Sequence, residues 1–379
     1  MTVPGNLHVQ LTDIAPPRRT ELPDGSPVWL VTRYADVRAL LADPRLSVDK
    51  ANGDGSWRGF SLPPALDANL LNMDPPHHTR IRRLVSQAFT PRRVEGLRPL
   101  IQQTADTLLD RIASTVDTGS VPGGEADLIR DYAGPLPVTV ISVLLGIPAA
   151  DRDAFRDWTG TMLLPPGGDR AAAARAIGAI HAYMQQLIAA KRAEPADDLL
   201  SALIAARDDG DRLDEDELTS LAFLLLLAGY ENTVHAIGTG ILTMLSHPGL
   251  PLDVEELLRH EPPATVLLRR FPTEDVEVPG AVLPRGETVL LVAGAANHDP
   301  DTFADPGEFR PGRAAGHLSF GHGIHYCVAA PLARIELEIA VGAVLRRFPA
   351  LRLAVPATDL PWLPSFRARG LAALPVRLT

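Results

Sequence analysis

The only cysteine of this chain, Cys327, ends the sequence Ser-Phe-Gly-His-Gly-Ile-His-Tyr-Cys, which begins at residue 319. A single cysteine cannot form an internal disulfide, nor supply a zinc or iron–sulfur site that needs several cysteines. Alone, it can bind one iron as a thiolate or act as a nucleophile. Gly321 and Gly323 permit tight turns and a close approach of the backbone to a flat, bulky group. These neighbours favour an iron ligand over a buried cysteine that only fills space.

The residues after Cys327 are apolar and compatible with a helix. We therefore expect a helix over 327–348, with Cys327 at its start. Unpaired N–H groups and the positive end of the helix dipole would stabilise a sulfur anion there. N–H groups directed at the sulfur would also tune the potential of a bound iron.

The pattern Phe-Gly-x-Gly-x-His-x-Cys, followed by Pro-Leu-Ala-Arg from Pro331, resembles the haem-binding signature of the cytochrome P-450 haem-thiolate monooxygenases. The signature is long and specific, and the resemblance covers nearly the whole chain. It implies a triangular, mainly α-helical fold with a minor β part, formed by residues 1–379 as a single domain. A haem b would lie between a long central helix and the cysteine helix.

Within this signature, the resemblance makes Cys327 the axial iron ligand and places Phe320, Gly321 and His325 in contact with the haem. One position departs from the family pattern, because Ala329 stands where glycine is usual. Alanine is the smallest possible change, so we expect close packing against the haem to be strained at most.

Hydrophobic residues make up 46% of the chain and charged residues 22%, so it can bury a large core. The net charge of −10 argues against nucleic acid as a partner. The N-terminus has no basic start, and the longest apolar run, 221–228, is far shorter than the roughly 20 residues of a membrane helix. A single cysteine fits a reducing compartment. We expect a cytoplasmic monomer without a membrane anchor.

No Gly-x-Gly-x-x-Gly turn follows a strand-like run, and there is no cysteine cluster, so the sequence shows no nicotinamide, flavin or iron–sulfur module of its own. Electrons for redox chemistry must then come from a separate protein, and the resemblance implies a ferredoxin with its reductase. A segment without acids carries a cluster of arginines that could receive an acidic partner: Arg80, Arg82, Arg83, Arg92 and Arg93. A plain solubilising surface is the alternative.

Apolar periodicity predicts a helix-dominated chain with a small strand-rich part. Helices are expected at 35–42, 78–89, 95–115, 126–145, 151–163, 172–191, 199–207, 214–246 and 253–260, besides 327–348. Strands are expected at 27–32, 276–291, 351–355 and 373–378, and residues 47–70 read as loop. Only a few residues separate Pro248 from Val254, where the family normally has a further helix.

Glu256 and Arg259 lie three residues apart, on one face of a predicted helix. Such pairs are usually exposed and contribute less than about 1 kcal/mol. The resemblance implies something more, namely a buried structural triad in which Arg313 joins these two residues.

His78 and Arg82 share a helix face, four residues apart, after Pro75-Pro76. Haem carries two propionates, which need cationic or N–H donors. The resemblance assigns this task to His78 and Arg82 together with Arg270 and His325. The alternative is a solvated basic helix face.

The helix predicted over 214–246 is apolar all round in its first half, which indicates burial. The family pattern Ala-Gly-x-(Glu or Asp)-Thr implies that Ala228 and Gly229 contact the haem and that Glu231 is the proton-relay acid. Gly229 also weakens the helix and favours a local bulge. The usual alcohol is replaced by Asn232, with Thr233 next to it. Asparagine can order a water but has no hydroxyl.

The leading hypothesis is a haem-thiolate oxidase that activates dioxygen to oxidise a mainly apolar small molecule of secondary metabolism. Oxidative coupling or ring closure without oxygen insertion is the first alternative, since Asn232 replaces the alcohol. A catalytically silent recruitment scaffold and a Cys/His hydrolase using His325 and Cys327 are less well supported. Candidate substrate-contacting segments are 47–70, 150–185, 224–227, 262–268 and 363–366.

Overall fold

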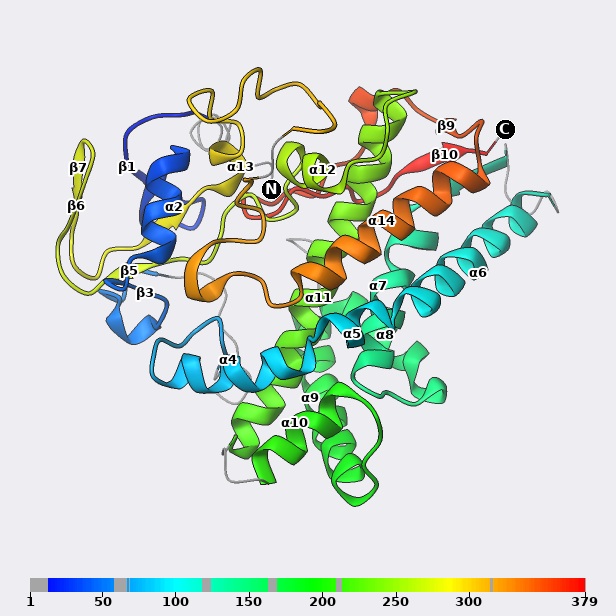
Figure 1. Ribbon diagram of the computed structural model, residues 1–379, viewed down its shortest axis with the longest axis horizontal. Helices are drawn as coiled ribbons and strands as arrows, with labels where there is room; N and C mark the ends of the chain where they lie inside the picture. Colours follow the sequence, from blue (N-terminus) through cyan, green and yellow to red (C-terminus); the bar gives the residue numbers. More distant parts are fainter. Residues whose placement is uncertain are drawn as a thin grey trace. The chain divides into compact units, whose positions relative to one another are not determined.

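The computed structural model describes residues 13–57, 67, 69–117, 124–162, 169–208, 213–313 and 316–378 (Figure 1). These residues are mostly helical, with four small sheets, as the sequence predicts. They group into two compact units: one within Met1–Arg82, Glu255–Val328 and Pro364–Arg369, the other within Arg83–Val254, Ala329–Leu363 and Gly370–Thr379. That the chain forms one domain stays a prediction.

The first unit holds most of the strands. Its largest sheet has the order β1 (Arg18–Glu21), β2 (Pro27–Val31) and β8 (Val289–Leu291); β1 and β2 are antiparallel, and β2 and β8 are parallel. Leu30 lies opposite Leu290, and both are buried in the core. The other elements are α2 (Tyr34–Ala42), β3 (Leu46–Ser47), β5 (Phe271–Pro272), β6 (Val276–Val278), β7 (Ala281–Leu283) and α13 (Ala293–Ala296).

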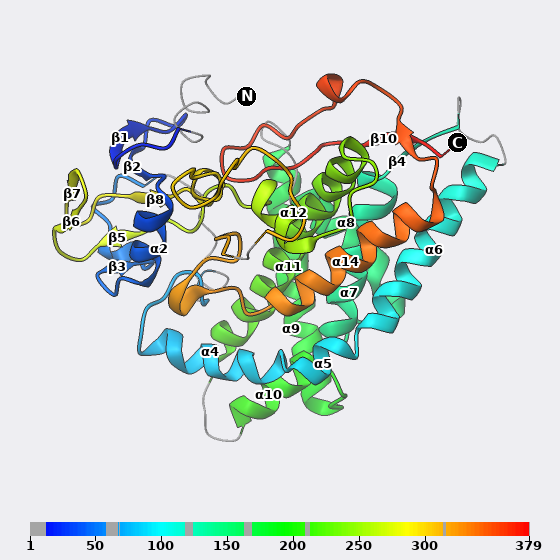
Figure 2. The ribbon, with the colours of Figure 1, turned by 45° about the horizontal axis from the view of Figure 1, so that its top comes forward.

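The second unit is a helical assembly around α11 (Glu215–Ser246), which packs against α7, α9 and α14 (Figure 2). Its helices are α5 (Pro91–Glu95), α6 (Arg98–Asp117), α7 (Pro135–Leu144), α8 (Arg152–Met162), α9 (Arg170–Ala193), α10 (Leu199–Asp208), α11 and α14 (Ala330–Arg347). Its sheet has the order β4 (Glu125–Asp127), β10 (Pro375–Arg377) and β9 (Arg352–Leu353). Helices α4 (His77–Ala88) and α12 (Val254–His260) each span a boundary between the units.

Helix α11 begins directly after its N-cap residue, Asp214. The Asp214 carboxylate accepts the Glu217 N–H, and the Glu217 side chain accepts the Asp214 N–H, which forms a capping box. By length and composition the helix could cross a membrane, with a mean hydropathy of 1.3 over an 18-residue window. However, 67% of that window is buried within the protein, as in the core helix of a soluble protein.

Two sequence predictions were wrong in their boundaries. Residues 126–145 do not form one helix: β4 is followed by a π-helical turn, Ile129–Ala133, and then by α7. The strand forms because it pairs with β10, about 250 residues later. The cysteine helix begins at Ala330, not at Cys327, because Pro331 lacks an N–H and is tolerated only in a first turn.

Glu336, in α14, provides a pH-dependent test of core packing. It is 4% exposed, and burial raises the pKa of its carboxyl from 4.5 to about 8. The folded state therefore keeps a proton that the unfolded chain releases, so the free energy of unfolding should fall as pH rises between these values. Glu336→Gln should remove this fall, on the order of 3 kcal/mol between pH 5 and pH 8 at about 1.4 kcal/mol per pKa unit. Urea unfolding at the two pH values measures it.

Glu338 provides the matched control, since it lies on the same helix with a side chain that is 54% exposed. Glu338→Gln should leave the pH dependence as in the unmodified protein. An undiminished fall in Glu336→Gln would show that the buried carboxyl is not its source.

Candidate active site

The loop that carries Cys327 is shaped by two glycines with positive φ, Gly321 at 74° and Gly323 at 73°. A Cβ atom at Gly323 would lie 2.8 Å from the carbonyl oxygen of Leu41, so no side chain fits there. The Cys327 N–H donates to the Phe320 carbonyl at 2.9 Å, which closes the loop. Cys327 is half-buried and lies three residues before α14 begins.

Four cationic or ionisable groups gather beside this loop, as the sequence led us to expect. The rings of His78 and His325 lie 4.4 Å apart, and Arg82 donates from Nη2 to the Tyr326 carbonyl at 2.6 Å. Burial, reinforced by the positive charge of Arg270 and then by His78 and Arg82, lowers the pKa of His325 to about 3. Burial also lowers the pKa of Arg270, which is 2% exposed, to about 10.

This cluster fits an anionic cofactor. Both ring nitrogens of His78 are buried without a hydrogen-bond partner among the described residues. Burial lowers the pKa of His78, and the positive charge of Arg82 lowers it further. Unpaired buried nitrogens and clustered cations are both unfavourable unless an acceptor with negative charge is present. A group bearing two carboxylates beside Cys327 satisfies both requirements.

Glu256 and Arg259 are both 2% exposed and form a two-point ion pair, with Nε–Oε2 at 2.7 Å and Nη2–Oε1 at 2.8 Å. Arg313 reaches the same carboxylate from Nε at 3.3 Å, and the Arg310 N–H donates to it at 2.8 Å. Burial disfavours the ionised carboxyl, but these donors hold the pKa of Glu256 below its usual value. The three residues named from the sequence therefore lie together.

Asn297 connects this ion pair to the cysteine loop, a connection that the sequence did not reveal. Its carbonyl accepts from Nη1 of Arg259 at 3.0 Å, while its side chain donates to Ser319 at 2.9 Å and accepts from the Leu318 N–H at 2.7 Å. Asn297 is fully buried. No periodicity marks it, since it follows a four-residue helix that forms only in the tertiary structure.

The site residues predicted on α11 belong to the second unit. Ala228 and Asn232 are exposed, Glu231 is half-buried, and Thr233 is buried. Thr233 donates its hydroxyl to the Gly229 carbonyl at 2.9 Å. The backbone is α-helical from Glu215 to Ser246, so the bulge expected at Gly229 is not seen.

The arginines predicted to receive a partner differ in exposure. Arg83 and Arg92 are exposed, whereas Arg80, Arg82 and Arg93 are half-buried. Arg93 pairs with Asp197 at 3.1 Å, and Arg82 contacts the cysteine loop. Of the five arginines predicted to receive a partner, Arg83 and Arg92 are thus the exposed ones.

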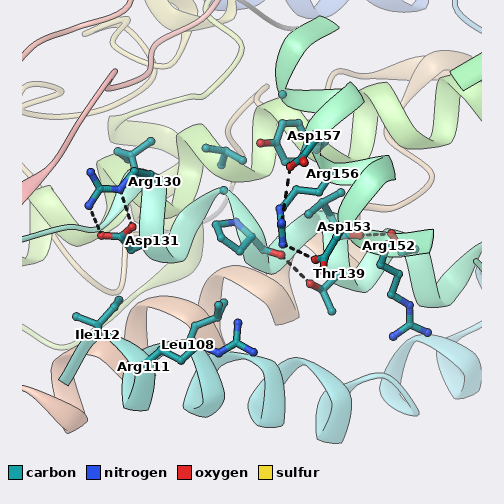
Figure 3. A pocket seen from close by; sticks show the side chains of 18 of the residues that line it. Leu108, Arg111, Ile112, Arg130, Asp131, Thr139, Arg152, Asp153, Arg156 and Asp157 are labelled. Carbon is teal, nitrogen blue, oxygen red and sulfur yellow. Dashed lines mark hydrogen bonds and ion pairs between the residues drawn. The ribbon is translucent and has the colours of Figure 1, made fainter. Parts of the chain in front are cut away.

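The second unit also contains a cavity of about 1000 Å³ between α6, α7 and α8, which reaches Tyr230 of α11 (Figure 3). The predicted site residues are not among those that line it. Its walls carry charges of both signs paired with each other, Arg156 with Asp153 at 2.9 Å and Arg130 with Asp131 at 2.7 Å (Figure 3). Such walls favour a solvated groove over a pocket for an apolar substrate.

Comparison with known proteins identifies the family. Residues 24–251 and 250–358 match the sequence profile described as Cytochrome P-450. The chain belongs to the cytochrome P-450 family. It is 45% identical to the monooxygenase PikC of Streptomyces venezuelae, over 99% of this chain and 91% of that protein, and 41% identical to the mycinamicin IV hydroxylase/epoxidase of Micromonospora griseorubida, over 97% and 94%.

Comparison with solved structures supports the same family assignment. The tirandamycin C-bound P-450 monooxygenase TamI is 41% identical, covers 100% of this chain and 98% of its own, and superposes with a TM-score of 0.87. The predicted P-450 fold is therefore confirmed, and so is a monooxygenase-type oxidoreductase of secondary metabolism. Members of this family bind haem through a cysteine thiolate, and Cys327 is the only cysteine available.

Proposed function

We propose that the protein is a cytoplasmic, monomeric monooxygenase that hydroxylates or epoxidises a mainly apolar polyketide. The observation that carries the haem chemistry is the cluster of two arginines, Arg82 and Arg270, and two histidines, His78 and His325, beside Cys327. The substrate class rests on relatives, which include the 6-deoxyerythronolide B hydroxylase of Saccharopolyspora erythraea, 42% identical over 93% of this chain.

Haem, when bound, supplies an iron that activates dioxygen. The thiolate of Cys327 would hold that iron and donate electron density to it, and Phe320 and Gly321 shape the loop that carries the cysteine. Arg82 and Arg270 would neutralise the propionates, and His78 and His325 would orient them through ring N–H groups. The buried triad of Glu256, Arg259 and Arg313 keeps the cysteine loop in place through Asn297.

On α11, Ala228 and Gly229 would contact the haem, and Glu231 would deliver protons from solvent. Thr233 is engaged with the Gly229 carbonyl, so its hydroxyl is occupied within the helix. Asn232 is exposed and lies one helical turn after Ala228. This supports Asn232, rather than Thr233, as the residue that orders a water or a substrate group.

Electrons reach the protein from a ferredoxin-type donor. Arg83 and Arg92 are exposed residues, and their positive charges would attract an acidic partner.

The propionate assignment predicts how fast the cofactor is lost. Arg270→Ala should increase the rate of haem transfer to an apomyoglobin acceptor by about 10- to 100-fold, because a hydrogen bond to a charged group contributes roughly 1.5–3 kcal/mol. Arg285→Ala is the control, since Arg285 is exposed at the end of a hairpin of the same unit. Equal transfer rates in the two variants would reject the assignment of Arg270.

The function is tested by product analysis under heavy-isotope dioxygen. Purified haem-loaded protein, supplied with a surrogate ferredoxin and reductase, is incubated with 6-deoxyerythronolide B and other macrolactones. We expect one labelled oxygen atom in the product. Product without label would instead indicate oxidative coupling, the alternative that the relatives do not favour. Absence of both binding spectra and product with all macrolactones would reject the proposed substrate class.

A further inference from the structure

One turn after Glu231, α11 carries a second ionisable group, His235. The residue is 5% exposed, and both ring nitrogens lack a hydrogen-bond partner among the described residues. A buried imidazole with two unpaired nitrogens is destabilising unless it has another purpose. Nothing in the propionate cluster, the ion-pair triad or the cysteine loop uses it.

The ring of His235 is directed toward Glu231. Nε2 lies 3.7 Å from Oε1 of that carboxylate, as expected for side chains four residues apart on a helix. A hydrogen bond needs an approach of only about 0.5 Å more. The Glu231 side chain is 34% exposed and that of His235 6%, so solvent reaches the carboxylate far more readily than the buried ring.

The C-terminal segment holds the ring in this orientation. A Cβ atom at Gly370 would lie 2.2 Å from Nδ1 of His235, so glycine is required for the close approach. The Gly370 carbonyl accepts from the Leu363 N–H at 2.9 Å, and Trp362 pairs with Leu371. The ring is therefore confined between this turn and α11, with Nε2 on the side of Glu231.

We propose that His235 is a positioning residue that orients the carboxylate of Glu231 and shares one proton with it. The Nε2–H bond of protonated His235 breaks as an O–H bond forms on Glu231, and no electrons are transferred. A proton from solvent water restores the pair through the exposed side of Glu231. This inference rests on the proposed role of Glu231 in proton delivery.

The first test is structural and needs no substrate. Imidazole ¹⁵N spectra of the haem-loaded ferrous–carbon monoxide form report which His235 nitrogen is protonated, with the signal assigned by its loss in His235→Asn. We expect Nε2 to be protonated and Glu231→Gln to change the Nε2 signal. A His235 signal that is unaffected by Glu231→Gln would overturn the proposed pair.

The second test measures product formed per reductant consumed. His235→Gln and His235→Asn should each lower this ratio about tenfold, the size of effect expected for a partner that orients a functional group. They should retain the thiolate-type spectrum. His247→Asn, at the C-terminal end of the same helix, should leave the ratio unchanged.

Combining substitutions at His235 and Glu231 separates the role of His235 from the role of Glu231. If His235 acts through Glu231, replacing His235 in a Glu231→Gln background should lower the ratio by less than about twofold. Additive losses, or no loss in either His235 variant while Glu231→Gln impairs coupling, would overturn the role of His235 alone. An unimpaired Glu231→Gln variant would remove the proposed role of Glu231 and the role of His235 with it.

Discussion

The Cys327→Ser variant is expected to lose the red-shifted Soret band that thiolate ligation gives the ferrous–carbon monoxide complex, and to lose all oxidation of substrate. Serine is nearly the same size, but its alcohol is not ionised near neutral pH and cannot replace a thiolate as an electron-rich ligand. The chain has no other cysteine to take its place. Difference spectroscopy of the reduced protein under carbon monoxide measures the band.

The control for this variant is Ala357→Ser, which adds a hydroxyl on an exposed turn. It should keep the band and the activity. A normal thiolate-type spectrum in Cys327→Ser would contradict the ligand assignment. Loss of the band together with retained haem would show that the substitution acts on ligation rather than on folding.

Glu256→Ala is expected to lower the free energy of unfolding by roughly 3–5 kcal/mol, because it leaves the buried guanidinium of Arg259 without its counterion. Arg259 is 2% exposed, and among the described residues its remaining donors reach the carbonyls of Asn297, Pro306 and Glu308, none of which carries a charge. Urea unfolding measures the change. Because Asn297 joins this pair to Ser319, haem content should fall as well.

Glu308→Ala is the matched control. Glu308 forms an ion pair with Arg310 at 2.7 Å, the same distance as the Nε–Oε2 contact of the buried pair, but its side chain is 65% exposed. Exposed pairs contribute about 0–1 kcal/mol, so this variant should be close to unmodified protein. Equal and small losses in both variants would reject a structural role for the triad.

The haem ligand could be predicted from sequence because its chemistry is local. Nine consecutive residues contain the thiolate and two glycines, and positive φ angles at Gly321 and Gly323 are what these residue types permit. The start of α11 is local in the same sense, because Asp214 caps it through its own side chain. The start of the cysteine helix was predicted three residues too early, although Pro331 restricts where α14 can begin.

Other features depend on partners far along the chain. Residues 125–127 form a strand only because β10 supplies hydrogen bonds to them, so helical periodicity predicted the wrong element. Strand formation depends on such pairing more than on intrinsic preference. The roles of His78, Arg270 and Asn232 in catalysis stay predictions.

The family, the thiolate ligand and the long core helix could be predicted from the residues alone, because each depends on neighbouring residues or on a regular apolar period. Three contacts arise only when the chain is folded: Arg270 lies close enough to His325 to lower its pKa, Asn297 joins Arg259 to Ser319, and Gly370 confines the ring of His235. These contacts join segments between 22 and 135 residues apart. The free energy of forming these contacts depends on how the whole chain packs, so they cannot be predicted from the residue types in one short segment.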